Sequence, residues 1–163
     1  MRFRADHEFP GPVSRVLAIL TRPRFYLDLT LPDLSQPDLV EETREGDTVL
    51  LRFRYEFVGT VDPIAQRLIG AGRLAWIQEV RIDASTGTGA LHFEAEKDPG
   101  RLHGDASFTF TESTGITTRH LDGELVVRVP AVGRMAERRI VPGIVRRLDI
   151  EAEAVDAALA AGD

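Results

Sequence analysis

The sequence predicts an α+β fold: a curved antiparallel sheet of about six to seven strands surrounds a long, kinked C-terminal helix, and two short helices follow the first strand. Three observations support this prediction. Several segments alternate apolar and polar residues, as half-buried strands do. One long stretch near the C-terminus repeats apolar residues at helical spacing. The length of 163 residues fits one domain, which we assign to residues 1–163.

The N-terminal segment predicts a strand followed by two short helices. Apolar and polar residues alternate from Arg2 to Phe9, and the prolines on either side of Gly11 end that strand. Apolar residues then recur at helical spacing over Val13–Leu20. Pro23 breaks this helix, and a second short helical turn is expected before Pro32.

The middle of the chain predicts further strands. A weak strand is expected around Leu39–Arg44, and clear alternation gives strands at Val49–Phe57 and Leu74–Asp83. Between them, Thr60–Gly72 permits a short helix. Three more strands follow as far as Gly123, separated by turn-forming residues.

The last three strands predict their own register. Even-numbered turns place Leu91 opposite Phe108 and Gly104 opposite Gly123, with every apolar phase on one face. Ala95, Gly104 and Gly123 would then form a row of small residues on the inner face. Such a row is typical of a sharp bend or of close approach by another element.

The C-terminal helix is predicted from Val132 to Ala160. Pro142 and Gly143 lie inside it, and an internal proline removes one backbone hydrogen bond at a cost of about 3 kcal/mol. We therefore expect a kink or a short break there.

Composition limits the classes of function. The net charge of −6 and the pI near 5.3 disfavour a nucleic-acid or anionic-membrane binder. The chain has no cysteine, so disulfides and thiolate chemistry are excluded. No apolar run approaches the ~20 residues of a membrane span, and the N-terminus has no apolar signal segment. We expect a cytoplasmic protein without stable membrane insertion.

The order of elements and two motifs resemble the START-like superfamily, also called SRPBCC or helix-grip. Phe3–Pro10 followed by Val13–Leu20 looks like its first strand and helix. Asp122–Leu125 with Val129–Gly133, leading into an arginine-rich helix, looks like an uncharacterised bacterial branch, a domain family of unknown function. The resemblance implies a hydrophobic cavity between sheet and helix. Members of the superfamily include cyclases, aromatases, dehydratases, carriers and sensors, so the fold alone does not decide the function.

Candidate ligand-binding residues lie in the inward phases of the strands and on the apolar stripe of the long helix. His7 could shuttle a proton or anchor a ligand, or it could be a core histidine. Arg119 could bind an anionic head-group, or it could bend out to solvent. The other three histidines fall in the outward phase, with His103 opposite Glu96, which argues against a metal site. The predicted pocket-lining residues are His7, Phe53, Tyr55, Phe57, Trp76, Phe93, Phe108, Arg119, Ile140 and Ile144.

Three hypotheses for function follow. The leading one is a non-catalytic binder of a hydrophobic or amphipathic small molecule, with no cofactor, metal or catalytic residue. The second is an enzyme of the polyketide cyclase or dehydratase kind, with His7, Tyr55 or Arg119 as polar participants. The third is an interaction module with a vestigial cavity. A buried guanidinium at Arg119 must be paired by a carboxylate of the protein, a ligand anion or water at an open mouth. Since no acid is assigned to the same inner patch, we expect an acidic or carbonyl group of the ligand to meet it. The oligomeric state stays open.

Overall fold

The computed structural model describes residues 1–60, 63 and 72–162. The helix expected within Thr60–Gly72 falls almost wholly outside these residues. The predicted order of a strand, two short helices, a run of strands and a long terminal helix is confirmed. The elements are β1 (Arg2–Pro10), α1 (Val13–Leu20), α2 (Pro23–Asp28), β2 (Asp38–Glu45), β3 (Thr48–Glu56), β4 (Ala75–Asp83), β5 (Thr88–Ala95), β6 (Leu102–Ser113), β7 (Ile116–Val127) and α4 (Gly133–Ala161).

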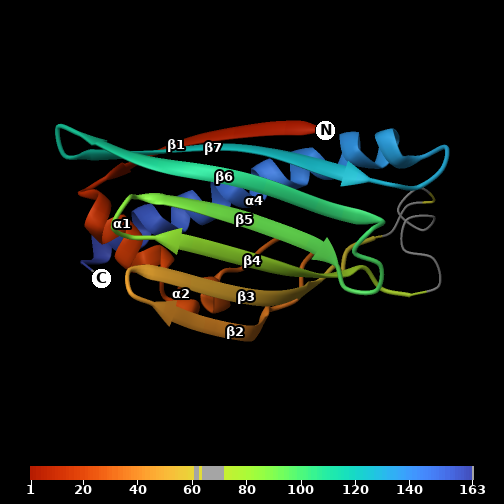
Figure 1. Ribbon diagram of the computed structural model, residues 1–163, viewed down its shortest axis with the longest axis horizontal. Helices are drawn as coiled ribbons and strands as arrows, with labels where there is room; N and C mark the ends of the chain where they lie inside the picture. Colours follow the sequence, from red (N-terminus) through yellow and green to blue (C-terminus); the bar gives the residue numbers. More distant parts are fainter. Residues whose placement is uncertain (61–62, 64–71, 163) are drawn as a thin grey trace.

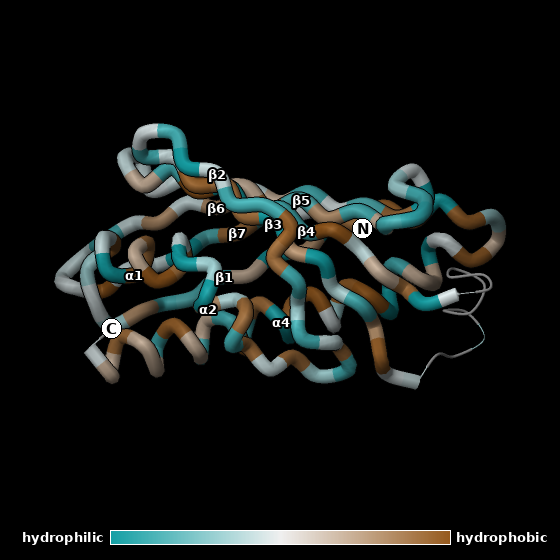
Figure 2. The backbone as a smooth tube through the Cα atoms, turned by 90° about the horizontal axis from the view of Figure 1, so that it is seen from below, coloured by the Kyte–Doolittle hydropathy of each residue, from teal (hydrophilic) through white to brown (hydrophobic). Residues whose placement is uncertain are grey.

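The strands form one seven-stranded sheet in the order β1-β7-β6-β5-β4-β3-β2. Every neighbouring pair is antiparallel. The first strand pairs with the last, so β1 forms one edge of the sheet and β2 the other (Figure 1). Figure 2 shows the sheet and α4 as two layers, with α1 and α2 near the end where the chain's C-terminus lies. The α+β prediction is therefore confirmed.

The predicted register of the last strands is wrong by two residues, although every side chain is on the predicted face. Leu91 pairs with Ala106 instead of Phe108, and Gly104 pairs with Leu125 instead of Gly123. The turn between β6 and β7 explains half of this error. Its two central residues are Thr114 and Gly115, both with positive φ (52° and 78°), as a tight hairpin turn requires. The predicted register placed the centre of that turn one residue earlier, which moves the pairing by two.

The correct register removes the row of small residues and replaces it with a different arrangement. Each glycine on the inner side of these strands lies opposite a phenylalanine whose ring covers it. A Cβ at Gly104 would come within 2.1 Å of the facing ring, so the close approach itself requires glycine. Ring and glycine together fill the space that two ordinary side chains would occupy. The three pairs are Gly89 with Phe108, Gly104 with Phe93, and Gly123 with Phe3.

The long helix α4 runs without interruption through Pro142. The short break expected there is absent. Its buried residues recur along one stripe that faces the sheet, from Ala136 through Leu148 and Val155 to Leu159. The C-terminal part of α4 packs on β1, β7 and α1. The helix therefore closes the core at one end of the sheet and bounds the candidate site toward the other.

Candidate functional site

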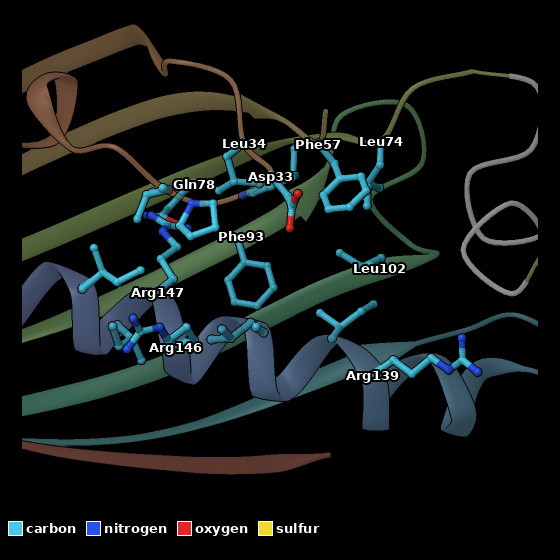
Figure 3. Close-up of a pocket in the computed structure, with 18 of the residues that line it drawn as sticks. Asp33, Leu34, Phe57, Leu74, Gln78, Phe93, Leu102, Arg139, Arg146 and Arg147 are labelled. Carbon is cyan, nitrogen blue, oxygen red and sulfur yellow. The ribbon is translucent and has the colours of Figure 1, made fainter. Parts of the chain in front are cut away.

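A cavity of about 450 Å³ lies between α4 and the inner face of β4, β5 and β6 (Figure 3). The loop that follows α2 supplies one wall, from Leu31 to Leu34. Most of the lining is apolar, because the inward phases of the strands and the stripe of α4 both face it. The apolar part of the lining is Leu31, Pro32, Leu34, Phe57, Leu74, Trp76, Leu91, Phe93, Leu102, Ala136, Ile140, Gly143, Ile144, Leu148 and Ile150.

Half of the residues predicted to line a pocket do line this cavity. These are Phe57, Trp76, Phe93, Ile140 and Ile144. Each lies where the predicted inward phase of a strand, or the apolar stripe of α4, reaches the cavity wall. Their role in ligand binding stays a prediction.

The other predicted residues are packed elsewhere. Phe53 is fully buried next to Tyr26, with ring centroids 5.0 Å apart. Phe108 lies over the backbone of Gly89. Both face inward as predicted, but the packing of α1, α2 and the C-terminal part of α4 fills that end of the inner face. Inward phase alone therefore does not identify a lining residue.

Tyr55 is buried behind the cavity wall. Its ring stacks on Trp76 at 5.7 Å and 15°, and the guanidinium carbon of Arg147 lies 4.4 Å from its centroid. Trp76 and Arg147 themselves line the cavity. Tyr55 thus supports two lining side chains from behind.

His7 and Arg119 belong to a buried polar cluster under α4, outside the cavity lining. Arg119 Nη1 donates to Glu151 Oε1 at 2.5 Å, and both side chains are under one-tenth exposed. Of the three partners considered for this guanidinium, a carboxylate of the protein is the one present, in place of the expected ligand group. Glu151 comes from α4, so the pair joins the sheet to this helix.

His7 lies between two charged partners in this cluster. Arg119 Nη2 is 3.1 Å from His7 Nδ1, and His7 Nε2 is 3.1 Å from Asp149 Oδ1. A guanidinium only donates, so Nδ1 must accept and Nε2–H must donate to the carboxylate. This assignment is the neutral tautomer, and it describes a structural histidine that links β1 to α4.

The charged residues of the cavity wall are mostly arginines of α4. Arg139, Arg146 and Arg147 line it together with Asp33 (Figure 3). Glu151 also belongs to the lining. Glu151 is already neutralised within the buried cluster. The wall thus carries three guanidinium groups, and that of Arg146 lies 3.8 Å from the carboxylate of Glu153.

One polar side chain was missed by the sequence prediction. Gln78 of β4 lines the cavity and is only 1% exposed. Its Oε1 has no hydrogen-bond partner in the described part of the chain. The signal was present: Gln78 is the one polar residue in the inward phase of Leu74–Ile82.

The remaining histidines of the sheet lie on its outer side, as predicted. His92 Nδ1 is 2.7 Å from Asp105 Oδ1, and His120 Nδ1 is 2.8 Å from Asp6 Oδ1. His103 pairs with Glu94 and not with Glu96, which follows from the corrected register.

The described residues contain neither a metal-binding cluster nor a membrane-spanning helix. Residues 1–60, 63 and 72–162 hold no group of three or more acidic or histidine side chains that could bind a metal ion. Among the helices described, none has the length and apolarity needed to cross a membrane.

The antiparallel sheet packed against one long C-terminal helix is the helix-grip fold. Solved structures with this arrangement cover nearly the whole chain. TTHA0849 from Thermus thermophilus is 16% identical, with a TM-score of 0.67 over 100% of this chain and 99% of that one. An aromatase/cyclase, Zhui from Streptomyces sp. R1128, is 13% identical, with a TM-score of 0.67 over 97% and 92%. Ara h 8.0201 is 10% identical, with a TM-score of 0.65 over 99% and 98%. At these identities the likeness shows the fold alone.

Within this fold the chain belongs to the family described as protein of unknown function (DUF2505), whose model matches residues 4–159. No protein of curated function matches the sequence. The predicted resemblance to a START-like branch of unknown function is confirmed.

Proposed function

We propose that this protein binds a hydrophobic or amphipathic small molecule in the cavity between the sheet and α4. The observation that supports this most directly is the cavity itself. Its volume of about 450 Å³ falls within the ~300–1,000 Å³ typical of ligand sites. A largely apolar wall with a few polar groups is also the usual composition of such sites.

The alternative of a cyclase or dehydratase receives less support from the geometry. Two of its three polar candidates, His7 and Arg119, bond to each other and lie outside the cavity lining. The third, Tyr55, is covered by Trp76 and Arg147. Three structural relatives are named aromatase/cyclases, but that activity is stated of the relatives. A vestigial cavity, as the interaction-module hypothesis requires, fits poorly with an open volume of this size.

Binding is tested with the neutral fluorescent probe N-phenyl-1-naphthylamine and a pair of tryptophan variants on α4. Ile144 lines the cavity, so Ile144→Trp should fill it and weaken probe binding at least tenfold. Met135 is 48% exposed and does not line the cavity, so Met135→Trp should bind like the wild type.

Native mass spectrometry of the purified protein complements the titration, because a co-purified ligand would appear as an added mass of lipid or polyketide size. Equal probe affinities in both variants, or no binding by the wild type, would contradict the proposal. Thermal unfolding of both variants checks that each is folded.

A further inference from the structure

Gln78 is a buried amide at the wall of an apolar cavity. It lies on the inner face of β4, paired across the sheet with Phe53 of β3 and Phe93 of β5. Its side chain is 1% exposed, and the close-up shows it among the residues that line the cavity (Figure 3). An amide at this position is surrounded by a hydrophobic environment on both sides along the sheet.

The carbonyl oxygen of this amide lacks a hydrogen-bond donor. Oε1 of Gln78 is buried and has no partner in the part of the chain that the structure describes. Burying an acceptor without a donor destabilises the folded protein, and most buried side-chain polar atoms are paired. A leucine would fill a similar volume without this cost. Four other buried polar atoms of the described residues also lack a partner, on Arg52, Tyr55, Arg119 and Asp156. Of these five residues Gln78 alone belongs to the cavity lining. A donor can therefore come from a molecule in the cavity, and because Oε1 itself is covered, the amide must turn toward the cavity to meet it.

We propose, on the basis of the proposed function, that the ligand of this cavity carries a hydroxyl or N–H group that donates a hydrogen bond to Gln78 Oε1. The rest of the ligand is largely apolar, because most of the lining is apolar and includes Trp76 on the same strand and Phe93 directly across from Gln78. Gln78 therefore discriminates between hydrophobic molecules of similar shape. It favours those that bear a donor at the matching point and disfavours those that leave the amide oxygen unpaired.

The test uses two fluorescent probes that differ by one hydroxyl group, 1-hydroxypyrene and pyrene. Each is titrated against the wild type, Gln78→Leu and Gln78→Met. The measured quantity is the ratio of variant Kd to wild-type Kd for each probe, which cancels the different water solubilities of the two compounds. A net hydrogen bond corresponds to about three- to tenfold in affinity. We expect both variants to weaken 1-hydroxypyrene by that factor and to leave pyrene unchanged or bound more tightly.

A control variant and a stability measurement accompany the titrations. Thr109→Val changes a polar residue on the exposed face of β6 and should alter neither affinity. Gln78→Leu should also raise the melting temperature of the unliganded protein, because it removes an unpaired buried oxygen. If the wild type binds both probes and the two ratios agree within twofold, the inference fails while the proposed function stands. If the wild type binds neither these probes nor N-phenyl-1-naphthylamine, both fail.

Discussion

Glu151→Leu is the substitution whose effect on stability follows most directly from the structure. The Arg119–Glu151 pair is 3% and 9% exposed, and its atoms are 2.5 Å apart. Without the carboxylate, the guanidinium keeps His7 Nδ1 and the Leu148 carbonyl as neutral partners, the latter at 3.4 Å. Removing one member of a buried pair leaves an uncompensated charge and costs about 3–5 kcal/mol. We expect a loss of that size in the free energy of unfolding.

Urea denaturation followed by circular dichroism measures this loss, with two controls. The double variant Arg119→Met/Glu151→Leu should recover much of it, because no charge is then left buried. The pair Arg4–Asp122 is nearly as close, at 2.7 Å, but is 70% and 63% exposed. Asp122→Asn should therefore cost at most about 1 kcal/mol. A loss for Glu151→Leu no larger than that of Asp122→Asn would refute the account of the buried cluster.

Three further predictions concern packing and titration. Gly104→Ala should destabilise the protein by about 1–3 kcal/mol in urea denaturation, because the added Cβ would meet a phenylalanine ring at 2.1 Å. Gly143→Ala on α4 is the control, because an added Cβ there meets nothing within 4 Å. It should be neutral or stabilising by up to about 1 kcal/mol. Burial raises the pKa of both tyrosines, Tyr26 and Tyr55. Their contribution to stability is therefore constant below about pH 10 and falls above it as the unfolded phenols ionise. Absorbance at 295 nm should then show both phenolates appearing together with unfolding; a phenolate signal near pH 10 in folded protein would contradict this. Burial raises the pKa of the Asp156 carboxyl, so its unfavourable effect is absent at low pH and grows as pH rises through the unfolded and then the folded pKa. Asp156→Asn should therefore be more stable than the wild type at pH 7 and equal to it near pH 3, and equal stability at pH 7 would contradict the sign.

The elements and the faces of the sheet could be predicted because they depend on local patterns. Alternation assigns each strand residue to a face, and even-numbered turns preserve that assignment whatever their length. The pairing itself could not be fixed in this way. It depends on where each turn is centred, and Gly115 indicates the centre only if the requirement for positive φ is applied.

The candidate site was predictable only where one element determined it. Phe93 and Ile144 follow from the phases of their own strand and helix. The partner of Arg119 could not be predicted in this way. Glu151 is 32 residues away, on a helix whose rotation relative to the sheet depends on tertiary packing. Gln78 was visible as a polar residue in an apolar phase, but its significance depends on the cavity in front of it. Long-range packing decides which inward residues line a cavity and which fill the core.

The central claim, that the cavity between the sheet and α4 binds a small molecule, is tested most directly by NMR. Titrating ¹⁵N-labelled protein with 1-hydroxypyrene should shift the backbone amides of Gln78 and Phe93 on the sheet and of Ile144 and Leu148 on α4. These residues line the cavity from its two sides. The amide resonances of both sets should therefore shift together and stop shifting at one equivalent of ligand. Shifts confined to the outer face of the sheet, or to the shallow groove at Val127–Arg134, would contradict the claim.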